Sequence, residues 1–360
     1  MEPLDIAIPV ASAFAVAAVA TPFVGRFALA IGAVDRPNDR GVNQRPNMPL
    51  CGGLAVAAGF AVSLVAAMML TDEGPDPVRL RGLLLGGLVV LMTGVCDDRF
   101  GLNAWQKLIG QLLAAGIAIA HGFQFPYFTN PFTQGLVDLP ESVTWAITVL
   151  WIVGITNALN LLDGLDGLAA GVGAIIAATL AAVSFQSDQP FVVLAGVALA
   201  AALLGFLPHN FAPARIFLGD TGALFVGFTL SVLALACYRR VSMITMIVPM
   251  LALAVPILDT VMSILRRIVQ HKPIFTADRQ HMHHRLLASE GSPRAAVIQF
   301  YMLTAAFCMI AVSFTRLQGI TAWVFLVTVL GLTVRLLWNL GVIGRVDEAA
   351  PSRGAEKGAS

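Results

Sequence analysis

The chain has 360 residues, of which 58% are hydrophobic and 12% are charged, with a formal net charge of +1 and a mean hydropathy of +0.82. Since a soluble domain carries about a quarter charged residues, this composition excludes an ordinary soluble protein and favours a polytopic membrane protein. No basic stripe with interleaved aromatic residues occurs, which argues against nucleic acid as a partner.

The apolar segments predict an all-α polytopic integral membrane protein with about eleven transmembrane helices. A helix needs about 20 residues to cross the hydrocarbon core. The first segment follows an acidic start, unlike a cleavable signal peptide, so we expect it to span the membrane. The predicted spans cover residues 4–31, 51–70, 80–96, 104–121, 143–158, 167–185, 190–207, 220–238, 243–265, 295–315 and 320–340.

The distribution of lysine and arginine predicts the orientation of these spans, because such residues are enriched in cytoplasmic loops. With the N-terminus outside, the predicted inner side holds fifteen of them and the outer side holds five, counting Lys107 and Arg81, which lie at the span ends next to these loops. We therefore expect a periplasmic N-terminus and a cytoplasmic C-terminus. We also expect one transmembrane domain over residues 1–345 and a disordered cytoplasmic tail over residues 346–360, which are small and polar.

Acidic residues are costly at membrane depth, so those at the ends of the spans are candidates for function. Asp97 and Asp98 follow the third predicted span. Two adjacent carboxylates suit a general base or a metal site, although a solvated loop that caps the next helix is an alternative. Lys107 is either a partner for a phosphate or an interfacial lysine.

Four polar residues recur every third position from the end of the fifth predicted span onward: Asn157, Asn160, Asp163 and Asp166. This spacing places them on one side of a helix or helix-like turn. Hydrogen bonding between helices explains one asparagine but hardly four such groups, so we expect them to face a polar cavity.

Two further stretches carry polar groups at the same predicted face. Asn210 lies in the turn before the eighth span, and Asp220 opens that span, either as a helix cap or as an oxygen ligand for Mg²⁺. The basic loop 266–294 contains a compact run that could bind Zn²⁺. Because arginines surround this run and cysteines are absent nearby, we favour phosphate contact. The run comprises His281, His283, His284 and Arg285.

Two remaining positions have weaker signals. Asp35 and Asn38 lie in the first inner loop, which on its own reads as an ordinary positively charged loop. Asp259 lies deep in the ninth predicted span, where it could pair with another helix or support the site from behind.

In combination, these motifs resemble the polyprenyl-phosphate N-acetylhexosamine-1-phosphate transferases (glycosyltransferase 4 type), and most closely their WecA-like branch, which uses undecaprenyl phosphate and UDP-GlcNAc. The resemblance extends over residues 30–290. It implies a multi-pass catalytic domain in the bacterial inner membrane with a cytoplasmic active-site cleft. The expected partners are a UDP-N-acetylhexosamine, undecaprenyl phosphate and the lipid bilayer. The oligomeric state stays open, with a homodimer as one option.

The resemblance also implies a reaction and a set of residues. The reaction gives UMP and a lipid-linked diphosphate sugar, as the first membrane step of a cell-surface polysaccharide pathway such as that of O-antigen, lipopolysaccharide or a wall polymer. Mg²⁺, with Mn²⁺ as a substitute, would be held by Asn160 and Asp220. Catalytic residues would be Asp97, Asp98, Asp163, Asp166, His281, His283, His284 and Arg285; substrate-binding residues would be Asp35, Asn38, Lys107, Asn157 and Asn210.

Two alternatives remain open. A secondary transporter also buries acidic residues, but it places its site near the bilayer midplane and often shows repeated halves, whereas these acids gather at one face. The sibling transferase that makes the peptidoglycan lipid precursor carries consecutive histidines, whereas residues 281–285 read His-Met-His-His-Arg.

Overall fold

The computed structural model describes residues 3–35, 47–70, 76–125, 128–129, 136–137, 139–237, 243–269, 292–315 and 320–339, together with Met282, Leu286, Leu287 and Leu317. The predictions made for the C-terminal tail, for Asn38, and for the histidines and arginine of residues 281–285 lie outside the described residues.

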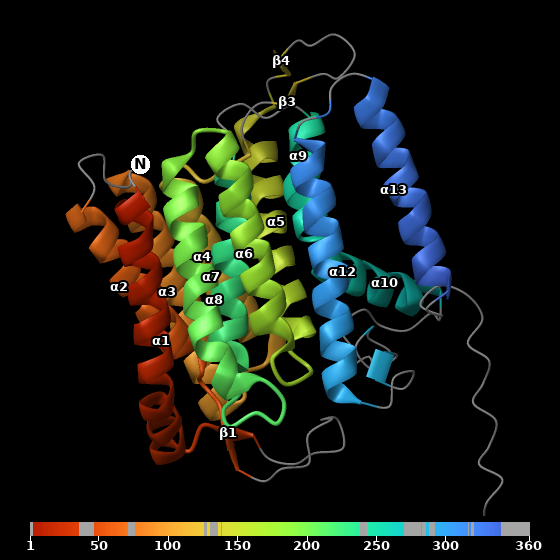
Figure 1. The fold of residues 1–360 in the computed structure, drawn as a ribbon. Helices are drawn as coiled ribbons and strands as arrows, with labels where there is room; N and C mark the ends of the chain where they lie inside the picture. The colour runs from red at the N-terminus through yellow and green to blue at the C-terminus, as the bar shows by residue number, and fades with distance from the viewer. Residues whose placement is uncertain are drawn as a thin grey trace, which may run out of the picture.

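The described chain is almost entirely helical, which confirms the predicted all-α class (Figure 1). The helices follow one another at the positions of the predicted apolar segments. They are α1 (Pro3–Ile31), α2 (Gly53–Leu70), α3 (Pro77–Phe100), α4 (Ala104–Ala120), α5 (Glu141–Leu162), α6 (Leu168–Gln186), α7 (Pro190–Asn210), α8 (Gly219–Ala236), α9 (Met243–Ala252), α10 (Ala254–Val269), α12 (Pro293–Phe314) and α13 (Ile320–Asn339).

Within the described residues, eight helices are long and apolar enough to cross a membrane: α1, α2, α3, α5, α6, α7, α8 and α12. The apolar helix α4 and the apolar stretch Trp323–Arg335 of α13 are shorter. The chain is therefore a polytopic membrane protein.

The ninth predicted span is broken at Leu253, where α9 ends and α10 begins. Pro256 has no N–H to donate to the carbonyl of Ala252, so the regular helical bond is lost there. The Cys308 thiol lies 3.9 Å from that carbonyl and offers it a weak partner from α12. Figure 1 shows the consequence, with α10 lying across the direction of α12.

Helix α8 forms the centre of the bundle, packed against α2, α3, α5, α6 and α7. Every residue of α8 except Asp220 is buried, so its lipid exposure is minimal. Because lipid tails are as apolar as leucine, this packing depends on close van der Waals contact rather than on escape from water. The N-terminus of α8 is thereby fixed at one end of the bundle.

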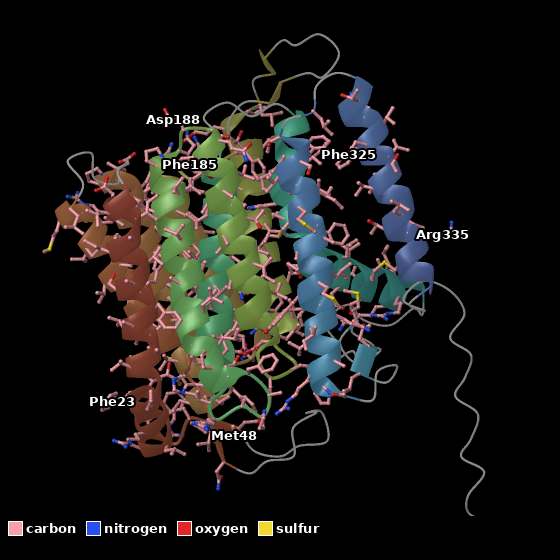
Figure 2. All side chains as sticks on the ribbon, viewed as in Figure 1. Phe23, Met48, Phe185, Asp188, Phe325 and Arg335 are labelled. Carbon is pink, nitrogen blue, oxygen red and sulfur yellow. The ribbon has the colours of Figure 1, made fainter. Side chains whose placement is uncertain are left out.

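Short strands mark the two ends of the bundle. At one end, β1 (Val34–Asp35) pairs antiparallel with β2 (Met48–Pro49), and Asp35 lies opposite Met48. At the other end, β3 (Phe128–Thr129) pairs antiparallel with β4 (Leu136–Val137). Figure 2 shows Phe23 and Met48 at the β1 end, with Phe185 and Asp188 at the opposite end. The polar motifs belong to the β1 end.

Candidate active site

Helices α3, α4, α5 and α8 bring charged and polar side chains together at the β1 end. The third predicted span continues past residue 96, so Asp97 and Asp98 lie on the last helical turn of α3 rather than in a loop. Successive residues of an α-helix point about 100° apart. The two aspartates therefore face different neighbours, although they are adjacent in sequence.

Asp97 faces Lys107 on α4 and, through it, Asp220 on α8. The Lys107 Nζ lies 2.6 Å from Asp97 Oδ2 and also contacts Asp220 Oδ2. The other oxygen of Asp97 accepts a 2.7 Å hydrogen bond from the Leu102 N–H. One ammonium group thus bridges two carboxylates whose repulsion would otherwise oppose this arrangement.

Asp98 faces the N-terminus of α8 and the entry to α2. Its Oδ1 accepts from the Asp220 N–H at 2.9 Å. Its Oδ2 accepts from the Thr221 hydroxyl at 2.6 Å, the Thr221 N–H at 3.2 Å and the Cys51 N–H at 3.1 Å. Asp98 therefore joins three segments that are far apart in the sequence.

Asn160, on the last turns of α5, donates its Nδ2 to Asp220 Oδ1 at 2.9 Å. Asp220 consequently meets an amide through one oxygen and an ammonium through the other. The structure thus joins the two residues predicted to hold a metal, Asn160 and Asp220, to the pair Asp97 and Lys107.

The donor set fits a divalent cation of the Mg²⁺ type. Asp97, Asp98 and Asp220 each offer a carboxylate oxygen, and these three oxygens lie within 4.8 Å of one another. Hard oxygen ligands are those that Mg²⁺ prefers. Three carboxylates and one ammonium leave two formal negative charges, which one divalent cation would balance.

The loop between α5 and α6 lies beside this cluster and is fixed by several contacts. Burial raises the pKa of the Asp163 carboxyl well above its usual range, and the carboxylates of Asp220, Asp98 and Asp166 raise that pKa further. Asp166 Oδ2 accepts from the Ala214 N–H at 2.8 Å, which ties the loop to the turn before α8. The loop thus presents a carboxyl group that resists ionisation.

Helix α12 braces the same two loops from outside. The Tyr301 hydroxyl donates to the carbonyl of Gly167 at 2.6 Å, and Arg294 Nε donates to the carbonyl of Ala212 at 2.8 Å. These contacts hold the loop that follows α5 and the turn that precedes α8.

The turn before α8 is closed by its own side chains and backbone. Asn210 is buried, and its Nδ2 donates to the carbonyl of Ile216 at 3.0 Å. The Arg215 N–H donates to the carbonyl of His209 at 2.8 Å. The Asn210 amide nitrogen therefore contacts the same turn that leads into Asp220, and it helps to hold that turn in shape.

Asn157 lies one helical turn from Asn160 and forms a reciprocal amide pair with Gln111 of α4. Asn157 Nδ2 donates to Gln111 Oε1 at 2.6 Å, and Gln111 Nε2 donates to Asn157 Oδ1 at 3.2 Å. Gln111 is buried. The pair joins α4 to α5, so it bears on the placement of both Lys107 and Asn160.

This amide pair predicts that a second substitution restores stability lost through the first. Asn157→Leu alone should destabilise the protein by about 1–3 kcal/mol, because the Gln111 amide is left buried without its partner. Adding Gln111→Leu removes both polar groups and should recover most of the loss. Thermal unfolding in detergent measures both steps. A double variant as unstable as Asn157→Leu would contradict the interpretation, and a stable but inactive one would favour substrate contact by Asn157.

The structure also describes two further predicted residues, Asp35 and Asp259. Asp35 is on β1, whose partner strand leads through Cys51 to Asp98. Asp259, on α10, accepts a 2.7 Å hydrogen bond from the N–H of Met282, and both residues are buried. Met282 lies between the predicted histidines in sequence, so this contact joins α10 to the segment that carries them, and the supporting role of Asp259 stays a prediction.

The sequence interpretation missed three contributors to this end of the bundle: Gln111, Thr221 and Tyr301. Each is an uncharged polar residue in a largely apolar helix, and such residues usually serve helix packing. Thr221 lies beside the recognised Asp220, which was the one available signal.

The helix bundle and the cluster of acidic residues with one lysine define an integral membrane protein with a polar site at one end of its spans. The model of glycosyl transferase family 4 matches residues 80–238, which include the helices α4 to α8 and all but the first three residues of α3. A Bacillus subtilis (strain 168) protein, named probable undecaprenyl-phosphate N-acetylglucosaminyl 1-phosphate transferase, is 37% identical over 92% of this chain and 90% of its own length. The chain belongs to the polyprenyl-phosphate N-acetylhexosamine-1-phosphate transferase family.

Two further relatives match over less of the chain. The decaprenyl-phosphate N-acetylglucosaminephosphotransferase of Mycobacterium tuberculosis (strain ATCC 25618 / H37Rv) is 34% identical over 79% of this chain and 76% of its own length. The phospho-N-acetylmuramoyl-pentapeptide-transferase of Staphylococcus epidermidis (strain ATCC 12228 / FDA PCI 1200) is 33% identical over 56% of this chain and 66% of its own length. The family consists of phospho-sugar transferases that act on a polyprenyl phosphate.

Proposed function

We propose that this protein transfers N-acetylhexosamine-1-phosphate, with GlcNAc-1-phosphate as the first choice, from a UDP-sugar to undecaprenyl phosphate. The products are UMP and a lipid-linked diphosphate sugar, the starting unit of a cell-surface polysaccharide. The observation that carries this proposal is the cluster of Asp97, Lys107, Asp220 and Asn160 at one end of the bundle, in a chain of this family. The names of the Bacillus and Mycobacterium relatives support GlcNAc as the sugar.

The reaction exchanges one P–O bond for another. An oxygen of the lipid phosphate attacks the sugar-linked phosphorus of the nucleotide sugar, and the bond from that phosphorus to the bridging oxygen breaks, so that UMP leaves. A phosphate monoester has its second pKa near 6, so the nucleophile is largely dianionic at pH 7 and a strong base is not required. Catalysis then consists mainly of positioning and charge neutralisation.

The residues of the site divide this work. Lys107 brings a positive charge to a place where phosphate oxygens gather, and Asp97 and Asp220 hold its ammonium group in position. Asp220 and Asp97, with Asn160 beside them, would hold Mg²⁺, for which Mn²⁺ could substitute. The bound ion would supply charge neutralisation on the diphosphate oxygens.

We place the site on the cytoplasmic face of the bacterial inner membrane. The excess of lysine and arginine in the predicted inner loops supports this orientation. Contacts among these loops support a shared face, since Asp98 reaches Cys51, Asp166 reaches Ala214 and Arg294 reaches Ala212. A cytoplasmic site gives direct access to a soluble UDP-sugar.

Purified protein supplied with undecaprenyl phosphate, Mg²⁺ and radiolabelled UDP-GlcNAc tests the proposal. We expect labelled lipid and an equal amount of UMP, both lost with EDTA and restored by Mg²⁺. UDP-GalNAc and UDP-N-acetylmuramoyl-pentapeptide serve as competing donors. Preference for the pentapeptide would move the protein to the sibling activity. No product with any donor, from folded protein that takes up a solute in vesicles, would favour a transporter instead.

A further inference from the structure

The start of α8 lacks a cap of its own. The first backbone N–H groups of a helix have no partner within that helix and need one from elsewhere. The residue at the N-cap position is Leu218, whose apolar side chain makes no capping hydrogen bond. Partners for these groups therefore come from outside the turn, and the Gly219 N–H hydrogen-bonds to Asp163 in the loop between α5 and α6.

Asp98, 122 positions before Asp220 in the chain, supplies the cap for the next two N–H groups. It accepts from the backbone N–H groups of Asp220 and Thr221, the first residues after Gly219 in α8. The Thr221 hydroxyl donates the shortest of its hydrogen bonds, at 2.6 Å. A carboxylate at a helix N-terminus also interacts favourably with the helix dipole.

Close packing leaves little freedom around this contact. A Cβ added at Gly219 would lie 2.5 Å from Asp98 Oδ2, and Gly219 has φ +71°, a conformation that favours glycine. A Cβ added at Gly94 of α3 would lie 2.5 Å from the backbone nitrogen of Thr221. The chains of α3 and α8 thus meet backbone to backbone at the first turn of α8.

The cap bears directly on Asp220. One of its hydrogen bonds comes from the backbone N–H of Asp220 itself, while the side chain of that residue meets Lys107 and Asn160. Thr221 has no exposed surface. It can therefore influence substrate or metal only through its neighbours.

We propose that the hydrogen bonds between Asp98 and Thr221 fix the first turn of α8 and thereby position Asp220. Thr221 is then a positioning residue for the carboxylate that would hold the metal. This inference rests on the proposed function and deepens it. It gives Asp98 the role of fixing α8. Asp97, the other member of the aspartate pair, then faces Lys107 and would hold the metal with Asp220.

The test uses Thr221→Val, which is nearly isosteric and loses the hydroxyl, and Thr221→Ser, which keeps it. The matched control is Thr229→Val, on the same helix. Thr229 is also fully buried, and its hydroxyl has no hydrogen-bond partner among the described residues. Binding of Mn²⁺ to the detergent-purified full chain is followed by the electron paramagnetic resonance signal of the free ion, and steady-state kinetics follow in parallel.

We expect Thr221→Val to weaken Mn²⁺ binding by about tenfold, the equivalent of one lost charge-assisted hydrogen bond. Thr221→Ser should restore it, and Thr229→Val should bind Mn²⁺ as the unmodified protein does. Faster backbone hydrogen exchange in the peptide that contains residues 219–223 should accompany the loss in Thr221→Val alone.

Unchanged Mn²⁺ binding in Thr221→Val would overturn the inference, even if hydrogen exchange became faster, because the contact between Thr221 and Asp98 would then be structural only. Equal losses in Thr221→Val and Thr229→Val would overturn it too. Unmodified protein that binds no Mn²⁺ and makes no product would overturn the proposed function itself. The two failures are therefore distinguishable.

Discussion

Asp220→Asn is expected to lower kcat by roughly 10²–10³-fold and to raise the Mg²⁺ concentration needed for half-maximal activity. The substitution keeps the size of the side chain but removes the charge that Lys107 and Asn160 both contact. It leaves a net formal charge of one negative unit in the cluster, which attracts a divalent cation less strongly. Steady-state kinetics over a Mg²⁺ titration measure both effects.

Asp188→Asn provides the matched control for this charge removal. Asp188 follows α6 at the opposite end of the bundle and has φ +51°, a conformation that asparagine adopts readily (Figure 2). This variant should retain the kinetics of the unmodified protein. Retained activity in Asp220→Asn with a normal Mg²⁺ requirement would remove Asp220 from the set of metal ligands.

Lys107→Met should shift the Mg²⁺ requirement in the opposite direction while also lowering kcat. Removing the ammonium takes one positive charge from beside three carboxylates, so the cluster attracts a divalent cation more strongly and the half-saturating Mg²⁺ concentration falls. The kcat falls by about 10²-fold, because a fixed positive charge near the transferred phosphoryl group is lost. The same Mg²⁺ titration records both parameters.

Lys107→Arg separates charge from shape in this experiment. It preserves the positive charge, so the Mg²⁺ requirement should stay near that of the unmodified protein, while the planar guanidinium fits two facing carboxylates differently and lowers kcat. A rise in the Mg²⁺ requirement of Lys107→Met would show that the lysine assists the metal instead of sharing its ligands. That result would contradict the charge balance described here.

The sequence predicted most of the helices and the gathering of acidic motifs at one end. Hydropathy depends on local composition alone, so the long spans could be placed without knowledge of packing. The alternation of spans then brings Asp97 and Asp220 to the same end, although they are far apart in sequence. The break at Leu253 has a local cause in Pro256, but its effect on the direction of α10 depends on neighbouring helices.

The assignment of partners within the site could not be predicted in the same way. Asp97 and Asp98 were indistinguishable as a dipeptide, and only the continuation of α3 to Phe100 sends them to different neighbours. The contact of Asp98 with Thr221 depends on how closely α3 and α8 approach, which no local pattern encodes. The same holds for Gln111, whose pairing with Asn157 depends on the packing of α4 against α5.

The most direct measurement of the central claim follows the two phosphorus atoms of the donor separately. UDP-GlcNAc labelled with ³²P at the sugar-linked phosphorus, and in a second sample at the phosphorus next to uridine, is given to purified protein with undecaprenyl phosphate and Mg²⁺. Transfer of a sugar phosphate predicts that the first label enters the lipid and the second leaves as UMP. Release of both labels as UDP, with only the sugar on the lipid, would contradict the account.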